Sequence, residues 1–267
     1  MSAMGGNGHQ KHRTAFLLRL GYRACMLEGF GDDIWITDGG IVSFFGYDYP
    51  TRMAVIRLAG GGLWLWSPVM ASPDLLKAVR ALGPVEHLVS PNKLHHLFLA
   101  EWQDKFPKAK LWGTASTIQR FPEIAFTGTL TDRAPADWEG EIDQFHFTNS
   151  PFLDEMAFFH RKSRTAIIAD LSQPFSESFL KGHWPGWLQW LARRIGMVEG
   201  KGYGPIEIRS TFFHRAKGRT KMLRLIGEEP ERVVVAHGEV ARSDGAAFLC
   251  RAFAWLLGSG RHRLKSQ

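Results

Sequence analysis

Residues 85–96 read VEHLVSPNKLHH, and this stretch gives the clearest indication of the fold. Residues 85–90 predict a buried strand, and a helix is expected over about 94–106. His95 and His96 lie where the strand gives way to the helix, so both can lean over the end of the strand. Imidazoles grouped in this way suit zinc or iron. A pair of surface histidines at the start of a helix is the alternative interpretation.

Two later strands also end in residues that can bind a metal ion. Asp170 closes the apolar run 165–169, and His237 with Gly238 directly follows the run 233–236. Each has a local alternative, since an aspartate can cap a turn and a histidine can simply occupy one. Together with the two adjacent histidines they supply three imidazoles and one carboxylate at strand ends. Such a set can hold a metal ion in tetrahedral or five-coordinate geometry.

The rest of the chain alternates between strand and helix patterns. Further strands are expected at 33–40 (ended by a glycine turn), 41–47, 53–58, 63–68, 110–113, 142–147, 154–160, 165–169 and 232–236. Further helices are expected at 73–82 (with Ser72 as N-cap and Pro73 in the first position), 184–198 and 245–257. Two strand-rich halves, each closed by a helix, fit an α/β sandwich better than a doubly wound parallel sheet.

No internal repeat or low-complexity linker divides the sequence, so a single domain is expected. It covers residues 31–258, between a flexible N-terminal extension at 1–30 and a basic C-terminal tail at 259–267. The helix expected at 184–198 is rich in tryptophan and basic residues. It could lie on a membrane surface or cover the site, but an amphipathic helix docked on the core is favoured.

The composition is that of an ordinary globular protein. Hydrophobic residues make up 45% of the 267 residues and charged residues 22%. The net charge of +7 permits anionic partners such as nucleic acid, phosphorylated metabolites or anionic lipid, although much of the excess lies near the two ends. Two distant cysteines, Cys25 and Cys250, form no disulfide framework, so a reduced cytoplasm is expected. No apolar run approaches the ~18 residues of a membrane span, and the run at 15–20 is too short for an export signal.

The order of strand, His-rich turn, helix, strand-Asp and strand-His-Gly resembles the metallo-β-lactamase-like superfamily. More closely, the sequence resembles a bacterial branch of it described only as a domain of unknown function. The resemblance runs from about Asp33 to Leu257 and is carried by YPTRM (49–53), LWLWSP (63–68), PNKLHH (91–96), FHRKSRT (159–165) and ADL (169–171). It implies a four-layer αββα sandwich of the metallo-β-lactamase type.

The resemblance also shows that the superfamily's metal motif, T-H-x-H-x-D-H, is altered here. When Ser90 takes the place of the threonine, the first two histidine positions fall on Pro91 and Lys93, which cannot bind a metal in that role. The aspartate position falls on His95 and the last histidine position on His96. The ligands of the first metal are therefore missing from this motif.

The other ligand positions of the superfamily also separate into those of the first metal, which are missing, and those of the second metal, which are kept. The histidine of its Gly-His-Thr turn falls near Pro151 and is absent, its bridging aspartate falls on Asp170, and its last histidine falls on His237. The resemblance therefore implies one surviving metal position, held by His95, His96, Asp170 and His237. It implies a single divalent metal ion, with zinc favoured over iron or manganese.

A single-metal hydrolase that acts on an ester, thioester or phosphoester is the first functional hypothesis, with Asp170 as the catalytic residue that positions the water. A binding protein that has lost catalysis and an iron-dependent redox or oxygen-handling protein are the alternatives. Nucleic-acid processing comes fourth, since no separate nucleic-acid module is present. The expected partner is a small-molecule substrate of open identity, and the oligomeric state is open too. His160 and Glu155 are secondary site candidates.

Overall fold

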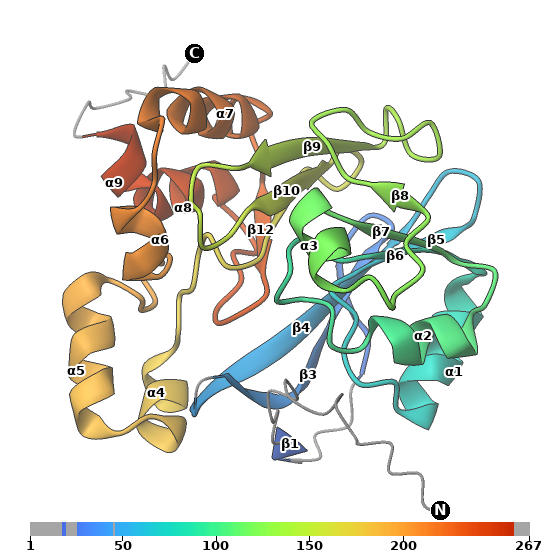
Figure 1. Ribbon diagram of the computed structural model, residues 1–267, viewed down its shortest axis with the longest axis horizontal. Helices are drawn as coiled ribbons and strands as arrows, with labels where there is room; N and C mark the ends of the chain where they lie inside the picture. The colour runs from blue at the N-terminus through green and yellow to red at the C-terminus, as the bar shows by residue number, and fades with distance from the viewer. Residues whose placement is uncertain (1–17, 20–25, 45, 259–267) are drawn as a thin grey trace, which may run out of the picture.

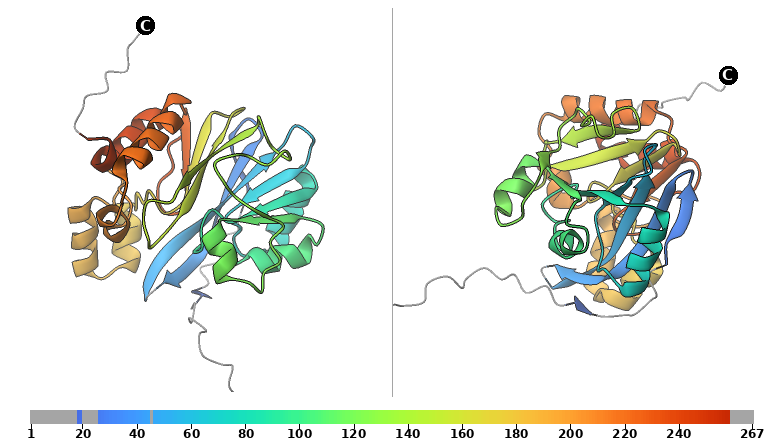
Figure 2. Two further views of the ribbon diagram at one scale, coloured as in Figure 1. Left: turned by 45° about the horizontal axis from the view of Figure 1, so that its top comes forward. Right: turned by 90° about the vertical axis from the view of Figure 1, so that its right-hand side faces the viewer.

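The structure, a computed structural model, describes residues 18–19, 26–44 and 46–258. The first sheet contains β1 (Leu18–Arg19), β2 (Glu28–Gly31), β3 (Ile34–Phe44), β4 (Tyr47–Arg57), β5 (Leu63–Trp66), β6 (Val85–Val89), β7 (Lys110–Gly113) and β8 (Gly128–Thr129). The second sheet contains β9 (Ile142–Phe147), β10 (Glu155–His160), β11 (Thr165–Ile168) and β12 (Arg232–Val235). The two sheets face each other, with helices on the outer sides (Figure 1 and Figure 2). The predicted αββα sandwich is confirmed.

Each sheet contains a run of parallel strands. The first sheet runs β1-β3-β4-β5-β6-β7-β8, with β2 also paired to β3, and the second runs β12-β11-β10-β9. Strands β5 to β8 run parallel to one another, and β11 runs parallel to β12, whereas β4 with β5 and β10 with β11 are antiparallel. Because parallel strands point the same way, the residues that follow them meet at one edge of each sheet.

Both faces of parallel strands such as β5 and β12 are buried, which explains their continuous apolar sequences. In β5, Trp64 and Trp66 belong to the core between the sheets, whereas Leu63 and Leu65 belong to the core under the outer helices. In β12, Val234 faces the inner core and its two valine neighbours face the helices of the other side. Because successive side chains of a strand point to opposite faces, the structure has three apolar layers, one between the sheets and one under the helices on each outer side.

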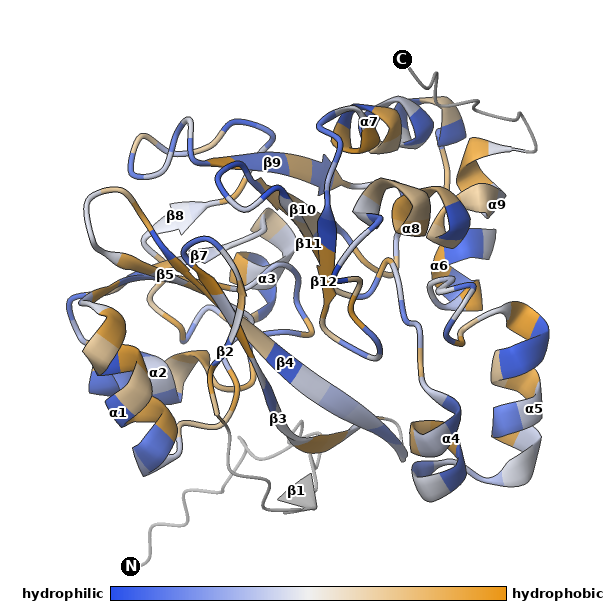
Figure 3. Cartoon of the chain, turned by 180° about the vertical axis from the view of Figure 1, so that it is seen from behind, coloured by the Kyte–Doolittle hydropathy of each residue, from blue (hydrophilic) through white to orange (hydrophobic). Residues whose placement is uncertain are grey.

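The helices form the two outer layers and the connections between the sheets. They are α1 (Pro73–Leu82), α2 (Leu99–Lys105), α3 (Ala115–Arg120), α4 (Glu177–His183), α5 (Gly186–Ile195), α6 (Ile206–Ser210), α7 (Arg215–Gly227), α8 (Gly245–Ala252) and α9 (Ala254–Leu257). Helices α1 and α2 pack on the first sheet, and α7 to α9 pack on the second. Figure 3 shows polar and apolar residues mixed along α1 and α7, as expected for helices with one buried face. Helix α1 begins as predicted, with Ser72 accepting a hydrogen bond from the Leu75 amide.

The predicted turn at Gly39 and Gly40 is wrong. Strand β3 continues through both glycines, and a bulge between Asp38 and Ile41 shifts its register with β4. The glycines serve close packing, because a Cβ on Gly39 would lie 2.7 Å from the Cβ of Val69. A bulge absorbs the extra residue without ending the strand.

Three predicted helices have different bounds. The helix expected at 94–106 is reduced to α2, because residues 93–98 form turns. The helix expected at 184–198 is reduced to α5; Trp184 is buried at the end of α4, whereas Trp187 and Trp190 are 59% and 64% exposed. The helix expected at 245–257 is interrupted at Phe253, between α8 and α9.

Part of the N-terminal extension predicted at residues 1–30 belongs to the first sheet, because β1 and β2 both pair with β3. Cys250 is a free, half-buried thiol, and Cys25 lies outside the described residues. Among the helices of the described ranges, none is both long enough and apolar enough to cross a membrane.

The glycine pair in β3 provides a test of this packing. We expect Gly39→Ala to lower the free energy of unfolding by about 1–3 kcal/mol, because the new methyl group must push against Val69 and the Thr51 hydroxyl. Gly40→Ala is the matched control, since no atom lies within 4 Å of its added Cβ. Urea unfolding of both variants measures the difference. Equal stability of the two variants would contradict the close contact.

Candidate metal centre

Three polar residues meet where the carboxyl ends of β6, β11 and β12 come together. His95 lies in the turns after β6, Asp170 lies two residues after β11, and His237 lies two residues after β12. These strands belong to different sheets, so the site spans the edge of the sandwich and joins both halves. The structure therefore brings together three of the four residues predicted from the sequence.

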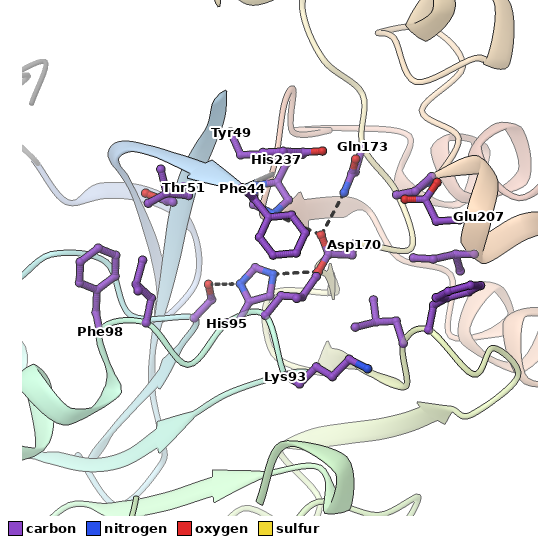
Figure 4. A pocket seen from close by; sticks show the side chains of 18 of the residues that line it. Phe44, Tyr49, Thr51, Lys93, His95, Phe98, Asp170, Gln173, Glu207 and His237 are labelled. Atoms are coloured by element: carbon purple, nitrogen blue, oxygen red, sulfur yellow. Dashed lines mark hydrogen bonds and ion pairs between the residues drawn. The ribbon is translucent and has the colours of Figure 1, made fainter. Parts of the chain in front are cut away.

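The ligand atoms of the three residues lie close enough to share one metal ion. His95 Nε2 lies 3.1 Å from Asp170 Oδ2, and His237 Nε2 lies 3.3 Å from Asp170 Oδ1 (Figure 4). All three ligand atoms lie within 4.8 Å of one another. Two imidazole nitrogens and one carboxylate make a donor set that suits zinc, and a set of this composition also occurs around non-haem iron.

The other ring nitrogen of each histidine is held by the protein. His237 Nδ1 donates to the carbonyl oxygen of Pro50 at 2.6 Å, and His95 Nδ1 lies 2.7 Å from the Ser67 hydroxyl. Since a carbonyl only accepts, Nδ1 of His237 carries a proton and Nε2 is the atom turned to Asp170. Histidines that bind metals are oriented by such contacts. A metal ion between Nε2 and the carboxylate would suit this orientation of the ring.

The position of Ser67 is unusual for its residue type. Its backbone has a φ of +50°, in the left-handed region that residues other than glycine seldom adopt. This conformation follows directly after β5 and brings the hydroxyl against His95. Strained backbone conformations of this kind often occur at functional sites.

Asp170 is 3% exposed and its carboxylate is well supplied with donors. Asn92 Nδ2 donates to Oδ2 at 2.9 Å and Gln173 Nε2 donates to Oδ1 at 2.9 Å. Burial alone would raise the pKa of this carboxyl group, but the charges and hydrogen bonds of His95 and His237 outweigh it and hold the pKa well below its usual range. Asp170 is therefore ionised across the physiological pH range.

A second carboxyl group, that of Glu155 at the start of β10, lies beneath the site and is fully buried. It accepts hydrogen bonds from the backbone amides of Ala169, Asp170 and Leu171 at 2.7 to 3.1 Å. It thereby fixes the segment that carries Asp170. Burial, and next the negative charge of Asp170, raise the pKa of Glu155 to about 8. Sequence reasoning placed Glu155 among the secondary candidates without this supporting role.

The His237 loop is held by a residue that sequence reasoning missed. The guanidinium of Arg52 donates from Nη1 to the carbonyl oxygens of Val235 and Gly238, both at 2.7 Å, and it pairs with Asp38. These two carbonyls flank His237. Gly238 has a φ of +105° and packs against the carbonyl of Pro174, so a side chain there would clash. Arg52 lies in the resemblance stretch 49–53, which was the only signal for it.

The fourth predicted ligand, His96, lies apart from the group of three. Its ring stacks on Phe121 with the ring centres 3.6 Å apart, and its Nδ1 lies 2.9 Å from the Lys93 carbonyl oxygen. Adjacent residues in a turn point in different directions, so only His95 faces Asp170. His160, a secondary candidate, is buried at the opposite end of β10 from Glu155 and contacts the Ser163 hydroxyl.

A pocket of about 460 Å³ opens beside the three residues. Most of its wall is apolar. Figure 4 shows His95, Asp170 and His237, which we call the triad, in the middle of it. The Tyr49 ring stands edge-on to His237, with the ring centres 5.5 Å apart. Burial, and next the charge of Asp170, raise the pKa of the Tyr49 hydroxyl, so Tyr49 remains a protonated donor. Lys93 and Glu207 also line the pocket.

Solved structures with a similar fold include metallo-β-lactamases. The DIM-1 metallo-β-lactamase has a TM-score of 0.58 at 13% identity, over 86% of this chain and 95% of that chain. A metallo-β-lactamase from Pontibacter korlensis has a TM-score of 0.57 at 12% identity, over 86% and 98%. A flavoprotein from Thermotoga maritima has a TM-score of 0.58 at 10% identity, over 86% of this chain and 60% of that chain. The fold is thus of the metallo-β-lactamase type.

Residues 31–178 match a family described as "Domain of unknown function (DUF4336)", and the chain belongs to that family. The matched region contains His95 and Asp170, whereas His237 lies beyond it. A search of the curated proteins finds no match. The resemblance to a domain of unknown function is confirmed, and so is the metallo-β-lactamase type of fold that was inferred with it.

The buried carboxyl group of Glu155 gives a prediction for the metal-free protein. Its pKa rises from 4.5 to about 8 on folding, so the folded state binds more protons between these values. The contribution of Glu155 to the free energy of unfolding must therefore fall as the pH rises from 4.5 to 8, by a few kcal/mol in order of magnitude. We expect the stability difference between wild type and Glu155→Gln to be larger at pH 5 than at pH 8.

Urea unfolding in the presence of a chelator at the two pH values measures this difference. The exposed Glu199 provides the control, because Glu199→Gln should keep the pH profile of the wild type. A difference for Glu155→Gln that is the same at both pH values would show that Glu155 does not titrate in this window.

Proposed function

We propose that His95, Asp170 and His237 bind one divalent metal ion and that the protein is a hydrolase of an ester, thioester or phosphoester. The observation that supports this most directly is the convergence of two Nε2 atoms on an ionised, buried carboxylate. The opposite nitrogen of each ring already has a partner, at Pro50 and at Ser67. The donor set, its spacing and its supporting contacts all fit a metal centre.

A divalent ion held by these residues would lower the pKa of a bound water and polarise the carbonyl or phosphoryl group of a substrate. The residues of the chain supply the other parts. Asp170 stays ionised and can orient the attacking water by accepting a hydrogen bond from it. Tyr49 stays protonated and can donate a hydrogen bond beside His237, where a negative charge develops on the substrate.

An iron-dependent redox or oxygen-handling protein is the second candidate. It is favoured by one observation, that two histidines and one carboxylate converge while His96 lies apart. Two histidines and one carboxylate form the arrangement of many non-haem iron sites. A similar fold in a Thermotoga maritima flavoprotein is compatible with redox chemistry on this scaffold.

Elemental analysis of the purified protein tests the metal centre. We expect about one zinc or iron ion per chain in the wild type, and we expect His95→Ala and His237→Ala to lose it, because each removes one of only three ligands. His96→Ala is the matched control and should keep the ion, since the His96 ring stacks on Phe121. Stoichiometric metal retained in the His95 and His237 variants would rule out this assignment. Iron in place of zinc would favour the second candidate.

Hydrolysis assays test the activity itself. The zinc-loaded protein is assayed with p-nitrophenyl esters, an acyl thioester and bis(p-nitrophenyl) phosphate, with a chelated sample as the blank. We expect turnover that zinc restores and that Asp170→Asn lowers by about 10²-fold or more, since Asn lacks the negative charge that holds the ion and orients the water. Turnover that persists after chelation, or equally in Asp170→Asn, would contradict the proposed mechanism.

A further inference from the structure

The wall of the pocket around the triad is apolar over most of its extent. On the side of the first sheet it is formed by Val42, Phe44, Leu97 and Phe98. On the opposite side, Phe152, Leu153 and Ile208 complete it. Figure 4 shows Phe98 and Glu207 on opposite sides of the His95–Asp170 pair, so the triad has pocket wall on both sides. An apolar wall of this kind stabilises a bound ligand by removing its hydrocarbon surface from water.

The charges along the pocket argue against an anionic reacting group. Among the described residues, Lys93 is the only lysine or arginine that lines it, and the carboxylates of Asp170 and Glu207 outnumber that single positive charge, so that even a divalent ion at the triad would leave only a small net positive charge. Phosphate groups are usually recognised by several arginines, lysines or backbone amides. A neutral carbonyl group therefore fits this pocket better than a phosphoester.

The polar groups are concentrated at the triad. Gln173 is 2% exposed and donates from Nε2 to the Asp170 carboxylate, which fixes the orientation of its amide group. Its Oε1 is buried and has no hydrogen-bond partner among the described residues. Tyr49 also reaches this end of the pocket (Figure 4). A buried acceptor without a partner calls for a donor such as a bound water, since an ester or thioester carries no donor of its own.

We propose that this pocket binds the aliphatic acyl chain of the substrate, which is a carboxylic ester or thioester of medium chain length. The chain lies along Val42, Leu97 and Phe98, and the carbonyl group lies at the triad. A volume of about 460 Å³ is at the lower end of the usual range of ligand pockets, which suits a medium chain. The cleavage of the bond rests on the proposed hydrolase function, but the binding of the chain does not.

Binding of a series of neutral methyl ketones tests the proposal. 2-Butanone, 2-hexanone, 2-octanone and 2-decanone are titrated into the chelator-treated, full-length protein by isothermal titration calorimetry. The uncharged carbonyl group is the same in every member, so the change along the series reports on the chain alone. We expect the affinity to rise roughly fourfold per methylene group and then to level off when the chain fills the pocket.

Variants at Leu97, which is half-buried and lines the pocket, locate the chain. Leu97→Trp should fill the space and abolish the gain in affinity for 2-octanone and 2-decanone. Leu97→Ala should enlarge it and move the levelling-off to a longer chain. Trp190→Ser is the control, because Trp190 is exposed and apolar but does not line the pocket. Thermal unfolding of each variant verifies that the fold is intact.

The outcomes separate this inference from the proposed function. An affinity that does not change along the series, or a gain that both Leu97 variants leave unaltered, overturns the acyl pocket. A gain that disappears equally in Trp190→Ser also overturns it, because the chain would then bind at the surface of α5. If the affinity depends on chain length but the protein binds no metal and hydrolyses no ester, the acyl pocket is supported and the proposed hydrolase function is contradicted.

Discussion

The Asp170 carboxylate is almost completely buried, and yet its pKa lies well below the usual range. An ionised group in such a place must be compensated by donors and positive charge. Asn92 and Gln173 supply two hydrogen bonds, while His95 and His237 approach from either side. Much of the architecture at this edge of the sandwich serves to bring these four side chains to one carboxylate.

That requirement explains several features that otherwise look costly. The Glu155 carboxyl group is buried without an ion pair in the described structure, and it holds the segment that follows β11 by three backbone hydrogen bonds. Ser67 adopts a left-handed backbone that places its hydroxyl against His95. Arg52 crosses from β4 to the carbonyls on both sides of His237. Together they pre-organise the triad before any ligand binds.

The pattern of the sequence predicts the central strands well, because residues such as those of β11 and β12 are apolar on both faces. It fails for α7, whose sequence RAKGRTKMLRLIG is polar and contains Gly218 in its interior. That glycine is needed because Phe212 packs closely against it, which only the tertiary structure shows. The glycines of β3 were misinterpreted for the same reason, since their contact with Val69 comes from a distant part of the chain.

The candidate site could likewise be predicted from the sequence only in part. Asp170 and His237 could be predicted because each follows a recognisable strand. The choice between His95 and His96 could not be made, since the direction of adjacent side chains depends on the turns at 93–98. The supporting contacts of Tyr49 and Arg52 depend on β4 lying beside the loop after β12, and nothing local in the sequence indicates that pairing.

The binding of one metal ion between the two sheets can be observed by anomalous X-ray diffraction from crystals soaked in zinc, recorded on both sides of the zinc absorption edge. We expect one strong peak at coordination distance, about 2.0–2.2 Å, from His95 Nε2, His237 Nε2 and an oxygen of Asp170. We also expect His96 to stay stacked on Phe121. A peak bound through His96, or no peak between His95, Asp170 and His237, would show that these three residues do not form the metal site.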